Sequence, residues 1–222
     1  MKCWLLTTPT ILFDLLQSDM MQTTKSNTPS DTYISKYNEI RSLYPQHIPV
    51  FTDGLKQGNH TATGVVLKSH IITKRLPNSV SIYTAELYAI LLALNELSKQ
   101  QHKHHLLFSD SLSSLNSIGN KKLDHPITSQ ILLKYHNLFT HSYNIIFCWL
   151  PSHVGIAGNE KAYKAAKSAL NKPILRIPIP CTDLKPIINK YIHDKWQQTW
   201  NSRTQNKTLS NLSNYTFLLH SI

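Results

Sequence analysis

The sequence predicts an α/β fold with a mixed β-sheet, built mainly from residues 48 to 170 of the 222-residue chain. Three short apolar runs, "IPVFTDG", "TGVVLKS" and "HIITKRL", are separated by turns that contain Gly or Asn, which predicts an antiparallel meander. The later apolar runs "HHLLFSD" and "NIIFCWL" alternate with helical patterns, which predicts parallel strands joined by helical crossovers. With 41% hydrophobic residues, the chain can build a core of ordinary size.

The helical patterns are "TAELYAILLALNELSKQ", "ILLKYHNLF" and "GNEKAYKAAKSAL". In the first of them Glu86 lies in the first predicted turn, and the positions on its own face are the apolar residues 89, 90, 93 and 97. Glu86 is therefore expected to point toward the sheet. The last helix is rich in alanine and follows the loop "PSHVGIAG", which carries His153.

Composition divides the chain into three parts. Residues 1–46 are interpreted as a linker-like N-terminal segment, because the stretch from about 15 to 35 is polar and low in core-forming residues. Residues 47–170 form the predicted domain. Residues 171–222 are interpreted as a tail that opens with prolines and continues as one amphipathic helix carrying Trp196 and Trp200.

The chain is strongly basic, with 23 Lys and Arg against 12 Asp and Glu and a formal net charge of +11. This charge favours a polyanionic partner such as nucleic acid, although a basic surface kept for solubility is the alternative. Three widely spaced cysteines indicate a reducing compartment. The interrupted apolar run at the N-terminus predicts neither export nor a membrane span. We therefore expect an intracellular protein, in the nucleus or the cytoplasm.

The scarce acids suggest a metal site. Asp53 and Asp110 each end an apolar strand, although Asp is depleted in strands and costly to bury without a partner. Together with Glu86 they would converge on one region, where like-charge repulsion requires cations between them. Oxygen ligands favour Mg²⁺ or Mn²⁺. Taken singly, the same acids also fit a turn, a helix start and a helix N-cap.

Four stretches, "FTDG", "YTAELYAILLAL", "FSDSLSSL" and "CWLPSHVGIAGNEKA", closely resemble the ribonuclease H domain of reverse-transcriptase proteins from non-LTR retrotransposons. The resemblance covers roughly residues 48 to 170. It implies a ribonuclease H-like five-stranded mixed sheet of order 3-2-1-4-5 flanked by helices. It also implies an endonuclease that cuts the RNA strand of RNA/DNA hybrids with two Mg²⁺ ions, for which Mn²⁺ can substitute.

By this resemblance, Asp53 bridges both metal ions, and Glu86 and Asp110 complete the shell of one. His153, on its loop, assists proton transfer or product release. The segment "YISKYNEIRSLYPQHIPVFTDG" is similar to the connection between polymerase and ribonuclease H in such elements, which implies linkage to a reverse transcriptase domain. The chain resembles an excised or degenerate fragment, and we expect it to be a monomer.

One position departs from the family pattern. In the family the stretch Gly-Asn-Glu is followed by one variable residue, Ala and then Asp, the fourth metal ligand, whereas Tyr163 stands at that position here. Tyrosine is neutral at pH 7, so one metal is expected to be held weakly. Glu160, one turn earlier, is a less favoured substitute. The alternative function is therefore a catalytically inactive hybrid-binding or relic domain.

Two further interpretations of the sequence are disfavoured. A transposase or integrase is disfavoured because those proteins place their Glu late, on the final helix, whereas Glu86 comes second in the order of acids here. The run "QQHKHH" at residues 100 to 105 has no carboxylate or cysteine partner nearby in the sequence. It is therefore interpreted as a solvated, weakly basic loop and not as a metal site.

Overall fold

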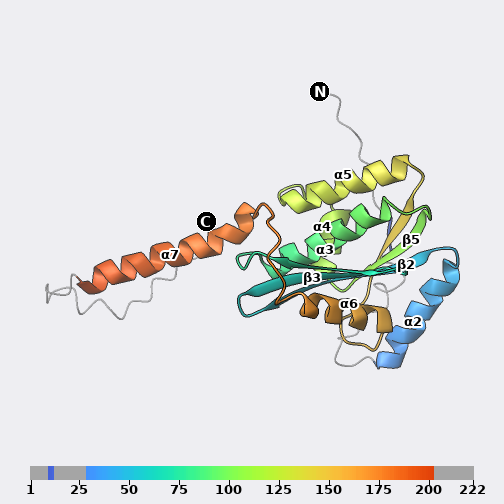
Figure 1. The fold of residues 1–222 in the computed structure, drawn as a ribbon, viewed down its shortest axis with the longest axis horizontal. Coiled ribbons are helices and arrows are strands. Elements are labelled where there is room, and N and C mark those ends of the chain that lie inside the picture. The colour runs from blue at the N-terminus through green and yellow to red at the C-terminus, as the bar shows by residue number, and fades with distance from the viewer. Residues whose placement is uncertain (1–9, 13–28, 203–222) are drawn as a thin grey trace. The chain divides into compact units, whose positions relative to one another are not determined.

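The computed structural model describes residues 10–12 and 29–202 (Figure 1). The described residues up to Pro180 belong to one compact unit, and the described residues from Cys181 onward belong to a second. The elements of the first unit are β1 (Thr10–Leu12), α2 (Ser30–Leu43), β2 (Ile48–Gln57), β3 (His60–Val66), β4 (Ile71–Leu76), α3 (Ile82–Leu97), β5 (His104–Ser109), α4 (Leu112–Gly119), α5 (Pro126–Thr140), β6 (Asn144–Trp149) and α6 (Ala157–Ser168).

The described strands form one mixed sheet in the order β1-β6-β5-β2-β3-β4. The β2–β3 and β3–β4 pairs are antiparallel, and the β2–β5 and β5–β6 pairs are parallel. Counted from β2, these five strands have the order 3-2-1-4-5, which confirms the predicted fold class. Strand β1 was not predicted: it adds a sixth strand at the edge of the sheet, parallel to β6.

Helices cover both faces of the sheet (Figure 1). Helices α3, α4 and α5 lie on one face, where residues such as Leu94, Leu107 and Phe147 form the larger core cluster. Helices α2 and α6 lie on the other face, over a second cluster that includes Phe51 and Phe108, whose rings stack with centroids 5.1 Å apart. The sheet of the predicted domain thus lies between two apolar core clusters.

Helix α2 corrects the interpretation of residues 1–46 as linker-like throughout. Tyr33 and Ile40 are only 3% and 1% exposed and belong to the second core cluster, with Tyr37 and Tyr44 packed against it. These residues recur every three to four positions, so one face of the helix is apolar although its overall composition is polar. The composition of the stretch hid a periodicity that indicates a helix.

Helix α6 lies unusually close to the sheet because both surfaces carry small residues. Ala162 and Ala166 are fully buried on its inner face, and the C-cap residue Ala169 is also fully buried. A Cβ atom placed on Gly64 of β3 would lie 2.5 Å from the backbone oxygen of Ala162 and 2.6 Å from the backbone nitrogen of Ala166. Glycine at this position therefore sets the distance of α6 from the sheet and the register of the helix. Both determine the position of residue 163.

The second unit consists, in its described part, of helix α7 (Cys181–Ser202). Trp196 and Trp200 stack one turn apart with ring centroids 5.4 Å apart, and Ile188, Tyr191 and Ile192 are exposed. Within residues 10–12 and 29–202, none of the helices combines the length and the apolar character needed to span a bilayer.

Candidate active site

The register of the parallel strands brings Asp53 and Asp110 together. Strands β2 and β5 pair from Ile48↔His105 to Thr52↔Ser109. Asp53 and Asp110 are the residues that directly follow this last pair, so they lie side by side. The hydroxyl of Thr52 donates a 3.1 Å hydrogen bond to the backbone oxygen of Phe108, which ties the two strands just before the acids. Strand β2 then continues beside β3, where Asp53 pairs with Gly64.

Glu86 reaches the same region from α3. The hydroxyl of Ser81 caps the helix by accepting from the backbone N–H of Thr84, and the helix begins at Ile82. Glu86 therefore lies in the second turn, not in the first turn as the sequence predicted. A Cβ atom on Gly54 would lie 2.6 Å from the backbone nitrogen of Glu86 and 2.9 Å from its carboxyl carbon. Only glycine at position 54 lets α3 lie this close to β2.

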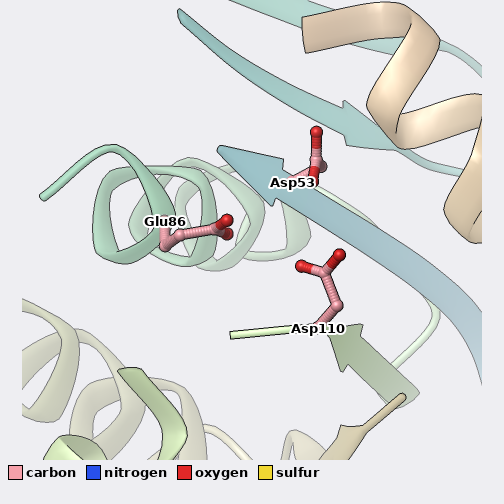
Figure 2. A group of neighbouring side chains, drawn as sticks. All are labelled: Asp53, Glu86 and Asp110. Carbon is pink, nitrogen blue, oxygen red and sulfur yellow. The ribbon is translucent and has the colours of Figure 1, made fainter. Parts of the chain in front are cut away.

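The three predicted acids form one cluster, as Figure 2 shows: Glu86 extends from α3 toward β2, and Asp110 projects from the end of β5 into the same space. One carboxylate oxygen from each of the three residues lies within 4.8 Å of the others. Asp53 and Glu86 are only 4% and 8% exposed, and Asp110 is half-buried. The sequence placed these residues together correctly.

This cluster is electrostatically unfavourable without a cation. Burial, with the charges of Asp110 and Glu160 added, raises the pKa of Asp53 from 3.8 to about 8. Burial and the charges of Asp110 and Asp53 likewise raise the pKa of Glu86 well above its ordinary value, and the hydrogen bond from the backbone N–H of Gly54 offsets this only in part. A cation between the carboxylates would remove the repulsion and restore the ionised forms.

The residues present fit a hard divalent cation. Asp53 Oδ2 and Glu86 Oε2 are buried and have no hydrogen-bond partner among the described residues. Buried carboxylate oxygens without a partner are costly unless a metal ion or water binds them. An all-oxygen set of carboxylates is the ligand type that Mg²⁺ and Mn²⁺ prefer. The cluster can therefore hold the ion that the sequence predicted.

His153 does not belong to the acidic cluster but lies on the loop that precedes α6. Its φ of 57° is in the left-handed region, which is uncommon for a residue other than glycine. The loop around it is anchored by Val154 and Ile156, which are buried in the second core cluster. The exposed His153 ring places Nδ1 3.7 Å from Glu160 Oε1.

Tyr163 occupies the position where the family pattern has a carboxylate. Its half-buried ring packs edge-on against His153, with centroids 5.1 Å apart, and Lys167 Nζ lies 5.9 Å from its ring centre. An aromatic contact thus replaces a charge at this position. Glu160 lies near the same site: its charge acts on Asp53, and its carboxylate faces His153. Its spacing from position 163 is consistent with this, because residues three apart share a helix face.

Comparisons with known proteins identify the family of the chain. Among solved structures, the chain is similar to ribonuclease H1 from the halophilic archaeon Halobacterium salinarum NRC-1, with 20% identity and a TM-score of 0.43 over 57% of this chain and 99% of that chain. A search of curated proteins finds no match. A comparison with protein families matches residues 45–171 to RNase H, which is more than half of the chain. The chain belongs to the ribonuclease H family.

Proposed function

We propose that this protein is a divalent-metal-dependent endonuclease that cleaves the RNA strand of RNA/DNA hybrids. The observation that carries the proposal is the buried cluster of Asp53, Glu86 and Asp110, which is strained by its own charge and fits an oxygen-bound cation. Membership of the ribonuclease H family supports the reaction type. The net charge of +11 supports a polyanionic substrate.

Each residue has a distinct part in this proposal. Asp53 would contact two Mg²⁺ ions, and Glu86 and Asp110 would complete the shell of one of them. Ions held there would supply Lewis acidity and an activated water for cleavage of a phosphodiester. The Nδ1 atom of His153 faces Glu160, so Nε2 is the nitrogen that can exchange a proton with the substrate or solvent. The exposure of His153 suits a role in proton transfer or product release.

Tyr163 should weaken the activity. A phenol is neutral at pH 7 and is a poor ligand for a hard cation, so the ion that depends on position 163 would be bound less tightly. Mn²⁺, which accepts less regular sites, should then support a higher rate than Mg²⁺ does. The same observation favours a second candidate function, a domain that binds the hybrid without cutting it, or a relic of an active enzyme.

The wider context is proposed on the sequence resemblance alone. The chain would derive from a non-LTR retrotransposon, in which a ribonuclease H domain of this kind is linked to a reverse transcriptase domain. We propose that it acts as a monomer inside the cell, in the nucleus or the cytoplasm, where RNA/DNA hybrids form. No part of the proposed chemistry requires a second copy of the chain.

A cleavage assay tests the proposal. The substrates are an RNA/DNA hybrid labelled on its RNA strand and, as controls, a DNA duplex and an RNA duplex of the same sequence. We expect fragments of the RNA strand from the hybrid alone, more in Mn²⁺ than in Mg²⁺ and none in EDTA. Binding of the hybrid without cleavage in either metal would support the non-catalytic alternative, and equal cleavage of all duplexes would contradict both.

A further inference from the structure

Residues 150–156 connect β6 to α6 and form the His153 loop, whose backbone has an unusual conformation. His153 and Gly155 both adopt the left-handed region, with φ of 57° and 85°. Val154 between them is only 6% exposed, whereas its two neighbours are exposed. A residue other than glycine keeps a left-handed backbone only where the surrounding structure holds it there. The position of His153 therefore depends on what packs against its loop.

Helix α2 packs against the His153 loop. Val154 and Ile156 belong to the same core cluster as Tyr33 of α2, and Ile34 packs against that cluster. A Cβ atom on Gly155 would lie 3.6 Å from Ile34 Cδ1. Apart from the chain neighbours of Gly155, no other described residue comes within 4 Å of that position. Ile34 is therefore the neighbour of the left-handed turn at Gly155.

Helix α2 is itself fixed to the sheet, so it can support the loop. The centroid of the Tyr37 ring lies 6.2 Å from that of Phe51 and 5.4 Å from that of Phe108. A Cβ atom on Gly158, in the first turn of α6, would overlap the ring of Phe51. Both helices therefore rest on the same group of aromatic rings, next to the His153 loop.

The side chain of His153, by contrast, faces α6. Its ring packs edge-on against Tyr163, and Nδ1 lies 3.7 Å from Glu160 Oε1. Helix α6 thus orients the ring, whereas α2 contacts the backbone turn that carries it. Helix α2 ends at Leu43, before residues 45–171, which match the ribonuclease H family. This support for the loop therefore lies outside the matched region.

We propose that α2 is a positioning helix for the His153 loop and that Ile34 is its positioning residue. Without the Ile34 side chain, Gly155 loses its packing neighbour, and the left-handed backbone at His153 is no longer the single favoured conformation. The His153 ring would then leave the ring of Tyr163 for part of the time. The inference rests on the proposed role of His153 in proton transfer or product release. The alternative is that α2 only adds to the overall stability of the fold.

Backbone dynamics test this positioning without any catalysis. In the full chain, nitrogen-15 relaxation gives order parameters for His153 and Gly155, at a temperature where circular dichroism shows each variant to be folded. We expect about 0.85, the value of a rigid backbone, in the wild type and less than about 0.6 in Ile34→Ala. Ile34→Leu keeps an apolar contact and should restore the wild-type values.

Ile40→Ala is the matched control, because Ile40 is 1% exposed on the same helix but lies about 9 Å further along its axis. Its loss should lower the overall stability and leave the His153 loop rigid. A rigid loop in Ile34→Ala would overturn the proposal. Equal loosening of the loop in Ile40→Ala would also overturn it, because α2 would then act only through the stability of the fold.

Cleavage of the RNA/DNA hybrid links the loop to the reaction. In Mn²⁺, Ile34→Ala should lower kcat by about tenfold and leave KM unchanged, because a misplaced catalytic group slows the reaction without removing contacts to the hybrid. Ile40→Ala should cleave as the wild type does. A loosened loop with an unchanged kcat would overturn the proposal. If neither the wild type nor the variants cleave the hybrid, the proposed function fails, and the order parameters still decide whether α2 positions the loop.

Discussion

The ring of Tyr163 packs edge-on against the ring of His153, with centroids 5.1 Å apart and an angle of 86° between the planes. The contact joins the middle of α6 to the loop that carries the candidate proton-transfer group. Glu160 lies one turn earlier and faces His153 Nδ1 at 3.7 Å. Around position 163 the chain thus has an aromatic contact and a close approach of His153 to Glu160, where the family resemblance implies a metal ligand.

Restoring the missing carboxylate should raise the activity. The buried alanines of α6 and their contact with Gly64 fix the register of the helix, so Tyr163→Asp places an acid where the family pattern has one. We expect the rate of hybrid cleavage in Mg²⁺ to rise by about two to four decades, because a ligand of a hard cation is regained. Single-turnover cleavage of a labelled hybrid measures this.

Tyr163→Phe is the matched control for this prediction, because it keeps the ring contact with His153 and adds no charge. Its rate should equal that of the wild type. If the wild type already cleaves in Mg²⁺ as fast as Tyr163→Asp, then Glu160 or water replaces the missing ligand, and the expectation of weakened activity is wrong.

The charge strain in the acidic cluster should make metal-free stability depend on pH. The unfolded chain ionises Asp53 near 3.8, whereas the folded chain keeps the proton until about 8. Between these values the folded state binds the extra proton, so stability falls as the pH rises. In EDTA, Asp53→Asn should show a smaller fall of stability with pH than the wild type does. Near pH 8 its free energy of unfolding should exceed that of the wild type by about 2 kcal/mol.

Urea unfolding at pH 5 and pH 8 measures this difference. Asp124→Asn, which changes an exposed acid, is the control and should follow the wild type. Addition of Mg²⁺ should stabilise the wild type at pH 8 and have little effect on Asp53→Asn. If the stability of the wild type does not fall between the two pH values, the pKa of Asp53 is not raised in the folded chain.

Much of the site could be predicted from the sequence because its acids stand in unusual places. Asp53 follows the apolar first half of β2, Asp110 follows β5, and Glu86 shares a helix face with buried apolar residues. Strand ends and helix faces are local features, and the α/β pattern then brings them together. The α/β class with a mixed sheet followed from the same local periodicities, whereas the five strands and their order 3-2-1-4-5 were implied by the family resemblance.

The rest depends on contacts between residues far apart in the sequence. Helix α2 was hidden because its polar composition outweighed the spacing of Tyr33, Tyr37 and Ile40. The edge strand β1 is held by pairing with β6, for which three residues carry no pattern of their own. The run at 100 to 105 was interpreted as a solvated loop, whereas its last two residues, His104 and His105, begin β5, and His105 is buried.

The close approach of α6 to the sheet predicts a steep cost for a larger residue at position 64. Gly64→Ala places a methyl group 2.5 Å and 2.6 Å from backbone atoms of α6, which cannot move independently. We expect a loss of about 1–3 kcal/mol in the free energy of unfolding. Gly58→Ala is an imperfect control because φ there is +57°, so Gly58→Asn, which tolerates this conformation and has open space, is preferred.

Thermal or urea denaturation of the two variants checks this prediction. The free energy of unfolding of Gly58→Asn should stay close to that of the wild type. The free energy of unfolding of Gly64→Ala should be clearly lower than both. A Gly64→Ala variant as stable as the wild type would mean that α6 can move away from β3, and the register argument for position 163 would then fail.

The basic charge predicts that binding of the hybrid depends on salt. With a net charge of +11, the affinity should come largely from phosphate contacts that release counterions. We expect the dissociation constant to rise by at least about tenfold between 50 and 200 mM KCl. Fluorescence anisotropy in EDTA measures binding without cleavage. Affinity that does not change with salt would contradict a mainly electrostatic interface.

The proposal that the three converging acids hold the catalytic metal is tested most directly by hybrid cleavage. The assay compares two chains that differ only at position 53. Tyr163→Asp is compared with the double variant Tyr163→Asp/Asp53→Asn in Mg²⁺, with the RNA strand labelled and hybrid binding measured in parallel. We expect RNA fragments from the first chain, and from the second chain binding without fragments. Equal cleavage by both chains would show that the acidic cluster is not the catalytic site.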